Sequence, residues 1–492
     1  ASIKASLSQE EKEDIIQRSI ALAERQEQTD DPGLLPKVGL EDVPQQLTEP
    51  SAVELALQGS EQAVSYFAQG TNGLCYQQVI MHLPQLDEEL LDILPLYTTC
   101  LTELGIADKD YAAVQAWQAQ VSGGVSCFSS IRSSPDDVQN THALISFSSK
   151  ALLSNHLAMT ELVEQTINQV RFDEDQRLRE LIEQICARKE SSITAQGHGL
   201  AMSLACSKMS PTAQLAHRSG GLEGIKRLKA LRTRLNSAEE REHLLQLFQQ
   251  LHQLILNSER QFLLIAEQEQ QSRVIDDLNQ VWQASTSSQQ QSRLALSSVR
   301  DRVREVWTTS TQVNFCAKAY ETVPSSHADN ATLHVLSGFM RNGYLHRAIR
   351  EQGGAYGGGA AQDASSASFR FFSYRDPRLQ ETLDDFDRAI DWVISEQHPA
   401  HQLEEAILGV IATMDKPSSP AGEAKQAHYN KLFGRTLEQR MEFRQRVLAT
   451  SLDDLRAVTS RYFDPNNASI GIVSNREALG SKFDQDFEIH NL

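Results

Sequence analysis

The chain has 492 residues, of which 40% are hydrophobic and 23% are charged, and its formal net charge is −19. This length exceeds what one hydrophobic core normally holds, so we expect a globular protein with two or more domains. An acidic balance without a basic stripe argues against a nucleic-acid partner. No apolar run approaches the ~20 residues that a membrane span requires, so no membrane partner is expected either.

The cysteines and the N-terminus bear on the compartment. None of the six cysteines belongs to a C-x-x-C pair; they are Cys75, Cys100, Cys127, Cys186, Cys206 and Cys316. This favours free thiols in a soluble protein of a cytoplasm-like reducing compartment over a disulfide framework, although the compartment itself stays unknown. The sequence begins Ala1-Ser-Ile-Lys-Ala5, with no initiator Met and no signal-peptide core. We therefore expect a fragment or a processed product.

A helix is predicted near the N-terminus, where Ser8-Gln-Glu-Glu11 forms a capping box before apolar residues at helical spacing. The helix should stop near residues 30–33, Asp-Asp-Pro-Gly, ahead of a proline-punctuated connector over 34–44. We assign residues 1–46 to a helical linker or hinge segment.

Residues 47–284 are predicted to form a first α+β domain. Two β-rich runs, 63–68 and 74–83, flank the turn Asn72-Gly73, which predicts a β-hairpin. Periodicity predicts further strands at 122–129, 143–148 and 261–266, and helices at 87–104, 150–169 and 235–256.

A second α+β domain is predicted over 285–492. Its first residues, Ser285 to Ser298, are rich in serine and glutamine and cannot bury much surface, which places a boundary there. Strands are predicted at 311–320, 369–374 and 468–473, and helices at 379–394, 401–413, 437–449 and 452–462. Because both domains mix β-rich runs and long helices in a similar order, we expect two tandem homologous α/β rolls. Each roll would be a mixed or antiparallel sheet packed with helices.

The most informative stretch is 343–360, Gly-Tyr-Leu-His-Arg-Ala-Ile-Arg-Glu-Gln-Gly-Gly-Ala-Tyr-Gly-Gly-Gly-Ala. A short helical pattern leads into a bend whose glycines allow positive φ and close backbone approach. Arg350 precedes the bend and Tyr356 lies inside it. Both side chains can donate hydrogen bonds to a carbonyl or a developing oxyanion. From the residues alone the alternative stays open that Arg350 pairs with Glu351 at the surface and Tyr356 packs in the core.

A phosphate-binding role for the glycine run is disfavoured. The run fits neither G-x-G-x-x-G nor G-x-x-x-x-G-K-[ST], and it follows a helix instead of preceding one. Close packing of a strand is the ordinary explanation of the glycines, and it is compatible with a binding role for their neighbours.

This stretch resembles the pitrilysin/insulinase-like zinc metallopeptidases of the presequence-protease type, whose C-terminal half carries the pattern Arg-Glu-x-Gly-Gly-Ala-Tyr-Gly. The predicted linker helix and the proline-rich connector also look like that family's linker. The resemblance implies that 47–284 and 285–492 are the third and fourth domains of the full-length architecture. Together they would form one bowl of a two-bowl substrate chamber.

The resemblance also implies roles for individual residues. Arg350 would anchor the substrate backbone and Tyr356 would donate from its hydroxyl to the oxyanion, so both are candidate catalytic and substrate-binding residues. Gly353 and Gly354 are further candidates for substrate binding. The segment around His198, Ala-Gln-Gly-His-Gly-Leu-Ala, resembles part of the third domain. We favour a packed or capping histidine there over a chamber-facing one.

Zinc ligands are not found in this sequence. A peptidase of this family needs H-x-x-E-H, whose histidines hold zinc and whose glutamate activates water. Neither that motif nor H-E-x-x-H occurs. His398 and His401 are the nearest lookalike, but Pro399 would make them straddle a helix start. We assign no metal or cofactor to this chain, and the resemblance places the zinc in an N-terminal half.

The hypothesis is therefore the zinc-free C-terminal half of a peptide-degrading zinc metalloendopeptidase. It would close the substrate chamber, contact unfolded peptides and be inactive alone. Its partner would be the N-terminal catalytic half, in the same polypeptide or as a separate chain. The alternative is a zinc-free binding or scaffolding subunit that pairs with a separate catalytic chain. An independent hydrolase is disfavoured because the sequence shows no coherent catalytic constellation.

Overall fold

The computed structural model describes residues 7–27, 36–282 and 292–492. The chain divides into two units, Ala1–Val43 and Pro44–Leu492. The described part of the first unit holds helix α2 (Gln9–Glu27) and the short helix η2 (Leu40–Asp42). The predicted capping box is confirmed, because Glu11 N–H donates to Ser8 Oγ and Ser8 N–H donates to the Glu11 carboxylate. The predicted end of this helix at 30–33 lies outside the described residues.

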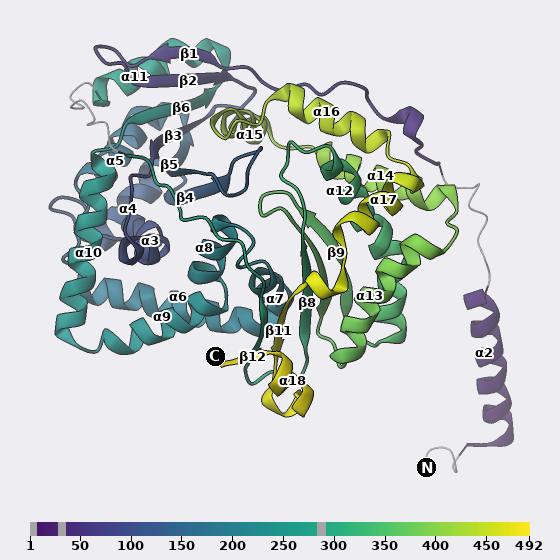
Figure 1. Ribbon diagram of the computed structural model, residues 1–492. Coiled ribbons are helices and arrows are strands. Elements are labelled where there is room, and N and C mark those ends of the chain that lie inside the picture. The colour runs from purple at the N-terminus through teal and green to yellow at the C-terminus, as the bar shows by residue number, and fades with distance from the viewer. Residues whose placement is uncertain (1–6, 28–35, 283–291) are drawn as a thin grey trace. The chain divides into compact units, whose positions relative to one another are not determined.

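The unit Pro44–Leu492 contains two six-stranded sheets (Figure 1). The strand order of the first sheet is β1-β2-β6-β3-β5-β4. Its strands are β1 (Val53–Ala56), β2 (Ala63–Ala68), β3 (Leu74–His82), β4 (Val125–Ser133), β5 (Thr141–Leu152) and β6 (Arg260–Ala266). The helices of this part are α3 (Glu88–Cys100), α4 (Tyr111–Val121), α5 (His156–Asn168), α6 (Asp175–Ala195), α7 (Gly197–Ala205), α8 (Pro211–Gly220), α9 (Leu222–Arg234), α10 (Ala238–Leu256) and α11 (Gln271–Trp282).

The strand order of the second sheet is β12-β7-β11-β8-β10-β9. Its strands are β7 (Arg304–Thr308), β8 (Phe315–Glu321), β9 (Gly357–Asp363), β10 (Ser368–Tyr374), β11 (Ser469–Ser474) and β12 (Glu488–Asn491). The accompanying helices are α12 (Asp329–Met340), η6 (Arg341–Gln352), α13 (Gln380–Ser395), α14 (Ala400–Met414), α15 (Pro420–Leu432), α16 (Leu437–Leu448), α17 (Leu452–Tyr462) and α18 (Ser481–Asp486). Among the helices that the structure describes, none is both long and apolar enough to cross a membrane.

Five strands of each sheet share one topology. In the first sheet β2 and β6 are parallel, and the pairs β6–β3, β3–β5 and β5–β4 are antiparallel. In the second sheet β7 and β11 are parallel, and β11–β8, β8–β10 and β10–β9 are antiparallel. Only the sixth strand differs, since β1 is antiparallel to β2 whereas β12 is parallel to β7. The predicted α+β fold with two homologous rolls is confirmed.

The predicted hairpin of β2 and β3 is wrong. The turn forms, with φ of 53° at Asn72 and 74° at Gly73. However, β6 lies between the two strands, parallel to β2 and antiparallel to β3. The inserted strand is an apolar run from much later in the chain, and five of its seven residues are buried. A fully buried strand such as β6 satisfies its hydrogen bonds on both edges, and a local turn signal cannot reveal that competition.

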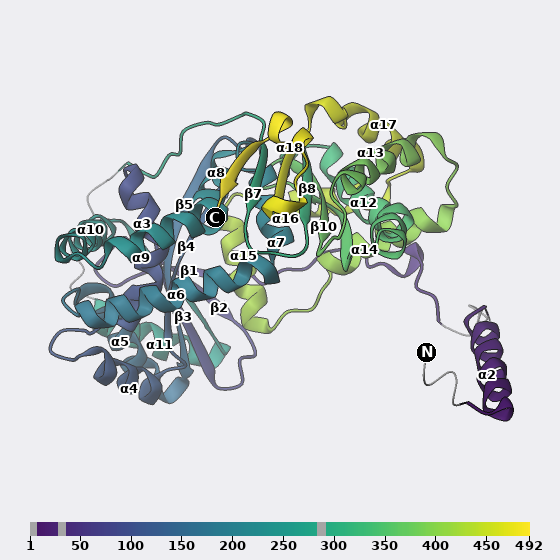
Figure 2. The same cartoon turned by 90° about the horizontal axis from the view of Figure 1, so that it is seen from below.

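The two rolls exchange helices. Helix α7 follows α6 of the first roll but packs on β8, β10 and β11 of the second sheet (Figures 1 and 2). In return, α15 of the second roll packs on the first sheet. Its alanines share a buried cluster with that sheet, formed by Ala421, Ala424, Ala427, Phe433, Phe67, Ile80, Leu144, Leu263 and Ile265. Each roll therefore covers apolar surface of the other.

Candidate functional site

Arg350 lies at the end of a long helix. Helix α12 continues directly into η6, a π-helix that ends at Gln352. Its buried residues Leu345, Ala348 and Ile349 face the protein, whereas Arg350 is exposed in the last turn. The short helical pattern predicted at 344–350 is thus the end of a longer element. Segments of π-helix occur frequently at functional sites.

Two glycines turn the chain from η6 into β9. The N–H groups of Gly353 and Gly354 both donate to the carbonyl of Arg350, and Ala355 N–H donates to Ile349 O at 3.1 Å. Gly354 has a φ of 78°, a conformation that costs glycine little and other residues more. A Cβ at position 353 would overlap the guanidinium of Arg378. The structure therefore gives both glycines a packing reason, and substrate contact with them stays a prediction.

Tyr356 is the first residue after this turn. Its N–H donates to Tyr374 O at 3.1 Å, which joins the start of β9 to the end of β10. Its side chain is not in the core, because 67% of the residue is exposed. The ring contacts the ring of Tyr374 edge-on. Within the described residues its hydroxyl has no hydrogen-bond partner.

Arg350 is also without a polar partner in the described parts of the chain. Its neighbour Glu351 instead lies 3.3 Å from Nδ1 of His346. The alternative of an Arg350–Glu351 ion pair beside a core tyrosine is therefore wrong on both counts. The bend presents one guanidinium and one phenol to solvent, with their donor groups unused.

The loop after β10 supports the bend from beneath. Arg378 donates to the carbonyl of Ala348 at 3.3 Å and to the carboxylate of Asp385 at 2.9 Å. Asp376 is fully buried, and its carboxylate accepts hydrogen bonds from the hydroxyl of Thr382 and the N–H of Arg378. Burial raises the pKa of Asp376. This network fixes the backbone on which Arg350 and Tyr356 are carried.

Tyr374 is a residue of the site that the sequence did not single out. Its hydroxyl donates to Ala195 O at 3.3 Å, and its ring lies 4.8 Å from the ring of His198. His198 is a half-buried, packed histidine in the first turn of α7, and burial lowers its pKa. The sequence did carry a signal for Tyr374, because antiparallel pairing of the strand 369–374 with the glycine run brings its last residue beside Tyr356.

The histidine pair at 398 and 401 does not fit a zinc site. His398 Nε2 lies 3.2 Å from the carbonyl oxygen of Trp392, and its ring lies 4.3 Å from the indole ring. Pro399 caps α14 as expected, and His401 is exposed on that helix. The geometry agrees with an ordinary helix entry.

Large cavities lie elsewhere in the molecule. One of about 670 Å³ lies among α12, α14, α16 and the far end of β9, and another of about 680 Å³ lies among α3, α6, α9 and α10. Neither is lined by Arg350 or Tyr356. The bend therefore faces open solvent in this chain.

Two protein-family models match the sequence. The model of the region associated with subfamily C of the M16 peptidases matches residues 1–231, and the model described as "PreP C-terminal domain" matches residues 304–469. The second match contains the whole of η6, the glycine bend and β10.

Relatives and solved structures give the same result. The chain is 29% identical over 478 residues to the mitochondrial presequence protease of Yarrowia lipolytica, covering 95% of this chain and 47% of that protein. It is 27% identical over 495 residues to the Xenopus laevis protein of the same name, covering 94% and 47%. The chain thus spans about half the length of these relatives.

The structure of a peptidase M16 inactive domain from Pseudomonas fluorescens has the same fold. It superposes with a TM-score of 0.60 at 14% identity, covering 87% of this chain and 99% of that one. The duplicated roll, the glycine bend and these matches agree. The chain belongs to the presequence-protease family of M16 peptidases, and it represents the C-terminal half of that family's architecture.

Proposed function

We propose that this chain is the zinc-free half of a peptide-degrading zinc metalloendopeptidase, in which it closes the substrate chamber and contacts the substrate. One observation carries the proposal: among the described residues, Arg350 and Tyr356 leave their hydrogen-bond donors unused on a bend that is otherwise fixed. Donors held ready in this way suit a ligand that arrives from outside the chain. The partners are the N-terminal catalytic half and unfolded peptides.

In the complete enzyme, a zinc ion held by the other half would polarise the scissile carbonyl and activate water. Tyr356 then donates its O–H to the oxyanion, and Arg350 donates from its guanidinium to backbone carbonyls of the peptide. The ring of Tyr374 limits the rotation of Tyr356 before substrate arrives. Donors oriented in advance stabilise the transition state without further reorganisation.

Gly353 and Gly354 have a narrower role in this scheme. Their N–H groups are already bonded to the carbonyl of Arg350. Contacts with substrate would therefore come from their Cα and carbonyl groups. Their absent side chains leave room for a peptide backbone to approach the bend.

The test is cleavage of a flexible peptide of a few tens of residues by this chain mixed with a separately expressed zinc-bearing half. We expect cleavage only in the mixture and none after addition of a zinc chelator. Tyr356→Phe removes one oxyanion donor and should lower kcat by about 10²–10³-fold. The matched control is Tyr111→Phe on α4, at a half-exposed ring of the first roll, which should leave kcat unchanged.

Other outcomes reject the proposal. A stable complex that cleaves nothing would identify the chain as a binding or scaffolding subunit. Cleavage by this chain alone, insensitive to the chelator, would contradict both functions. Full activity of the Tyr356→Phe mixture would leave the half-enzyme function standing but remove the oxyanion role.

A further inference from the structure

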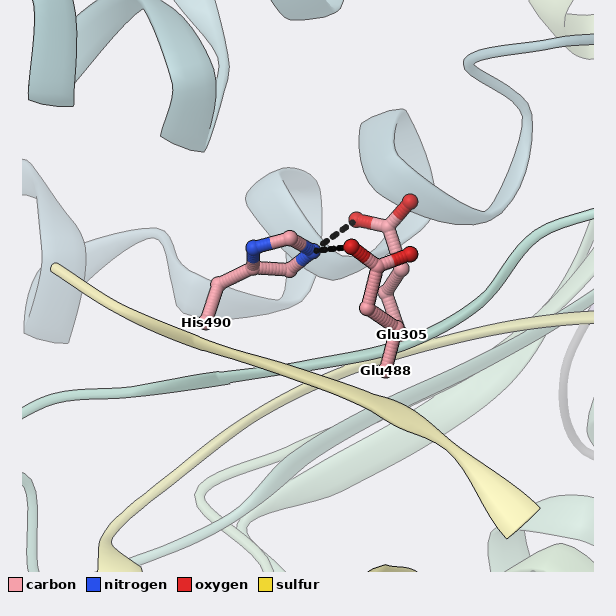
Figure 3. Close-up of side chains that lie close together, drawn as sticks. All are labelled: Glu305, Glu488 and His490. Atoms are coloured by element: carbon pink, nitrogen blue, oxygen red, sulfur yellow. Dashed lines mark ion pairs between the residues drawn. The ribbon is translucent and has the colours of Figure 1, made fainter.

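Three side chains with metal-binding atoms converge at the edge of the second sheet (Figure 3). Glu305 comes from β7, whereas Glu488 and His490 come from β12, at the other end of this roll's sequence. The two strands are parallel neighbours, and their register pairs Glu488 with Glu305 and His490 with Trp307. Since alternate residues of a strand share a face, all three ligand groups lie on one side of the sheet. Their ligand atoms all lie within 4.8 Å of one another.

The spacing of these atoms resembles a coordination shell more than a hydrogen-bonded cluster. His490 Nε2 lies 3.4 Å from Glu305 Oε2 and 3.3 Å from Glu488 Oε1. An N–H···O hydrogen bond is usually shorter, about 2.9–3.0 Å. Two ligand atoms bound tetrahedrally to zinc at about 2.0–2.1 Å are about 3.3–3.4 Å apart. The imidazole nitrogen and the two oxygens therefore stand where three corners of a zinc tetrahedron would be.

The charges of the cluster also call for a cation. Two carboxylates directly opposite each other on neighbouring strands repel, and this repulsion destabilises the sheet edge. A divalent ion between them would remove the repulsion, as would a protonated His490. The side chain of Glu488 is 69% exposed, so an ion has an open path from solvent.

Groups around the cluster orient its ligands. Trp307 Nε1 donates to Glu305 Oε2 at 3.1 Å, and the Trp307 ring stacks on the His490 ring with centroids 4.8 Å apart. The side chains of Glu305 and His490 are only 15% and 25% exposed. Outer groups that fix the rotamers of ligands in this way are a regular part of metal sites.

We propose that Glu305, Glu488 and His490 bind a divalent cation of the zinc class, with water as the fourth ligand. One imidazole nitrogen and two carboxylate oxygens suit zinc better than calcium or magnesium, which prefer more oxygen ligands in larger shells. The bound ion fastens β12 to β7. It stabilises the folded chain by mass action, independently of any peptidase activity.

The test uses the full chain after chelator treatment and dialysis. Zinc is titrated against a chromogenic chelator, and cobalt(II) serves as a spectroscopic probe whose visible absorption is intense only in tetrahedral coordination. We expect one site per chain and a melting temperature that rises with added zinc. His490→Ala and Glu488→Gln should each weaken binding by at least about tenfold and remove the rise.

His243→Ala is the matched control, because His243 Nε2 lies 3.0 Å from Glu89 Oε1 in an exposed pair without a third ligand among the described residues. That variant should bind zinc as the parent chain does. Glu488→Gln changes one mostly exposed side chain, so its metal-free melting temperature should match the parent and separate lost binding from lost folding. Zinc binding that is absent, or equal in Glu488→Gln and the parent, would overturn the proposal and leave an ion pair with protonated His490.

Discussion

The ring of Tyr356 meets the ring of Tyr374 edge-on, with centroids 5.5 Å apart and the two planes at 87°. Tyr374 is itself held by the carbonyl of Ala195 and by the ring of His198. Both of these groups belong to the junction between α6 and α7. An exposed phenol of the second roll is thus braced through one ring by helices that follow the first roll in sequence.

The first prediction concerns that brace. Tyr374→Ala should lower kcat/KM of the reconstituted peptidase by up to about tenfold, because an aromatic pair contributes about 0.5–1.5 kcal/mol. Tyr374→Phe keeps the ring and should restore most of the activity. Peptide-cleavage kinetics of both variants give the answer. Equal losses in the two variants would show that the hydroxyl matters and the ring does not.

Arg350→Ala should raise KM for peptide by roughly 10- to 100-fold, since a hydrogen bond from a charged group contributes about 1.5–3 kcal/mol. The melting temperature should stay unchanged because Arg350 has no polar partner among the described residues. Arg350→Lys should recover part of the loss. Arg347→Ala, at an exposed arginine of the same helix, is the control and should leave KM unaltered. An equal effect at both positions would indicate general attraction by positive charge.

Gly353→Ala should destabilise the chain. The new methyl group would overlap the Arg378 guanidinium and lie 2.6 Å from Ile349 O. Arg378 cannot move freely because it is paired with Asp385. We expect a loss of about 1–3 kcal/mol in the free energy of unfolding, measured by urea denaturation. Gly357→Ala, where a Cβ would meet no atom within 4 Å, is the control. Equal stability of the two variants would contradict the close packing at position 353.

Acid should destabilise the first roll through His252. Burial lowers the pKa of His252 to about 4, and its Nδ1 lies 2.8 Å from the hydroxyl of Tyr97. The unfolded pKa is about 6.5. Between these values the unfolded state binds a proton that the folded state does not, so the free energy of unfolding falls as pH drops from about 6.5 to about 4. The full loss is about 3 kcal/mol.

His252→Gln removes this titration. Urea denaturation at several pH values should show a shallower slope in that window for the variant than for the parent chain. The exposed His243 gives the control, since His243→Gln should leave the slope unchanged. Parallel slopes in the His252 variant and the parent would reject the assignment.

Arg444 should be the most costly of the arginines we would replace. Its guanidinium donates to both carboxylate oxygens of Asp415 and to the carbonyl of Pro44, and its side chain is only 1% exposed. Removing one partner of a buried ion pair typically costs about 3–5 kcal/mol. Arg444→Ala should show this loss in urea denaturation. Arg446→Ala, at an exposed pair with Glu442, should cost less than about 1 kcal/mol. A small effect at both positions would contradict a buried pair.

The sequence predicted the fold class because hydrophobic periodicity is strong in most elements. It missed α15, whose buried face is largely alanine and gives a weak apolar pattern. The cap was nevertheless readable, since Ser419 accepts from Gly422 N–H and Pro420 occupies the first turn. The order β2-β6-β3 could not be predicted, because it depends on pairing between strands distant in sequence. The Ser- and Gln-rich segment at 285–291 lies outside the described residues, and the domain boundaries stay predictions.

For the site, the glycines marked the bend, so Arg350 and Tyr356 could be found from sequence. Arg378 and Tyr374 support the bend from a different loop and strand, and no local motif announces them. The group of Glu305, Glu488 and His490 was also missed, because its members come from opposite ends of the second roll's sequence. Only the register of β12 on β7 joins them.

The exchange of α7 and α15 sets how this chain can be cut and recombined. A break between the rolls would strip α7 from the strands it covers and expose the alanine face of α15 to water. Gene fusion or fission that separates the rolls would therefore leave two sticky, incomplete fragments. A break ahead of Pro44 would leave every one of these contacts intact. The pair of rolls is thus the smallest module of this chain that evolution or an engineer can move as one piece.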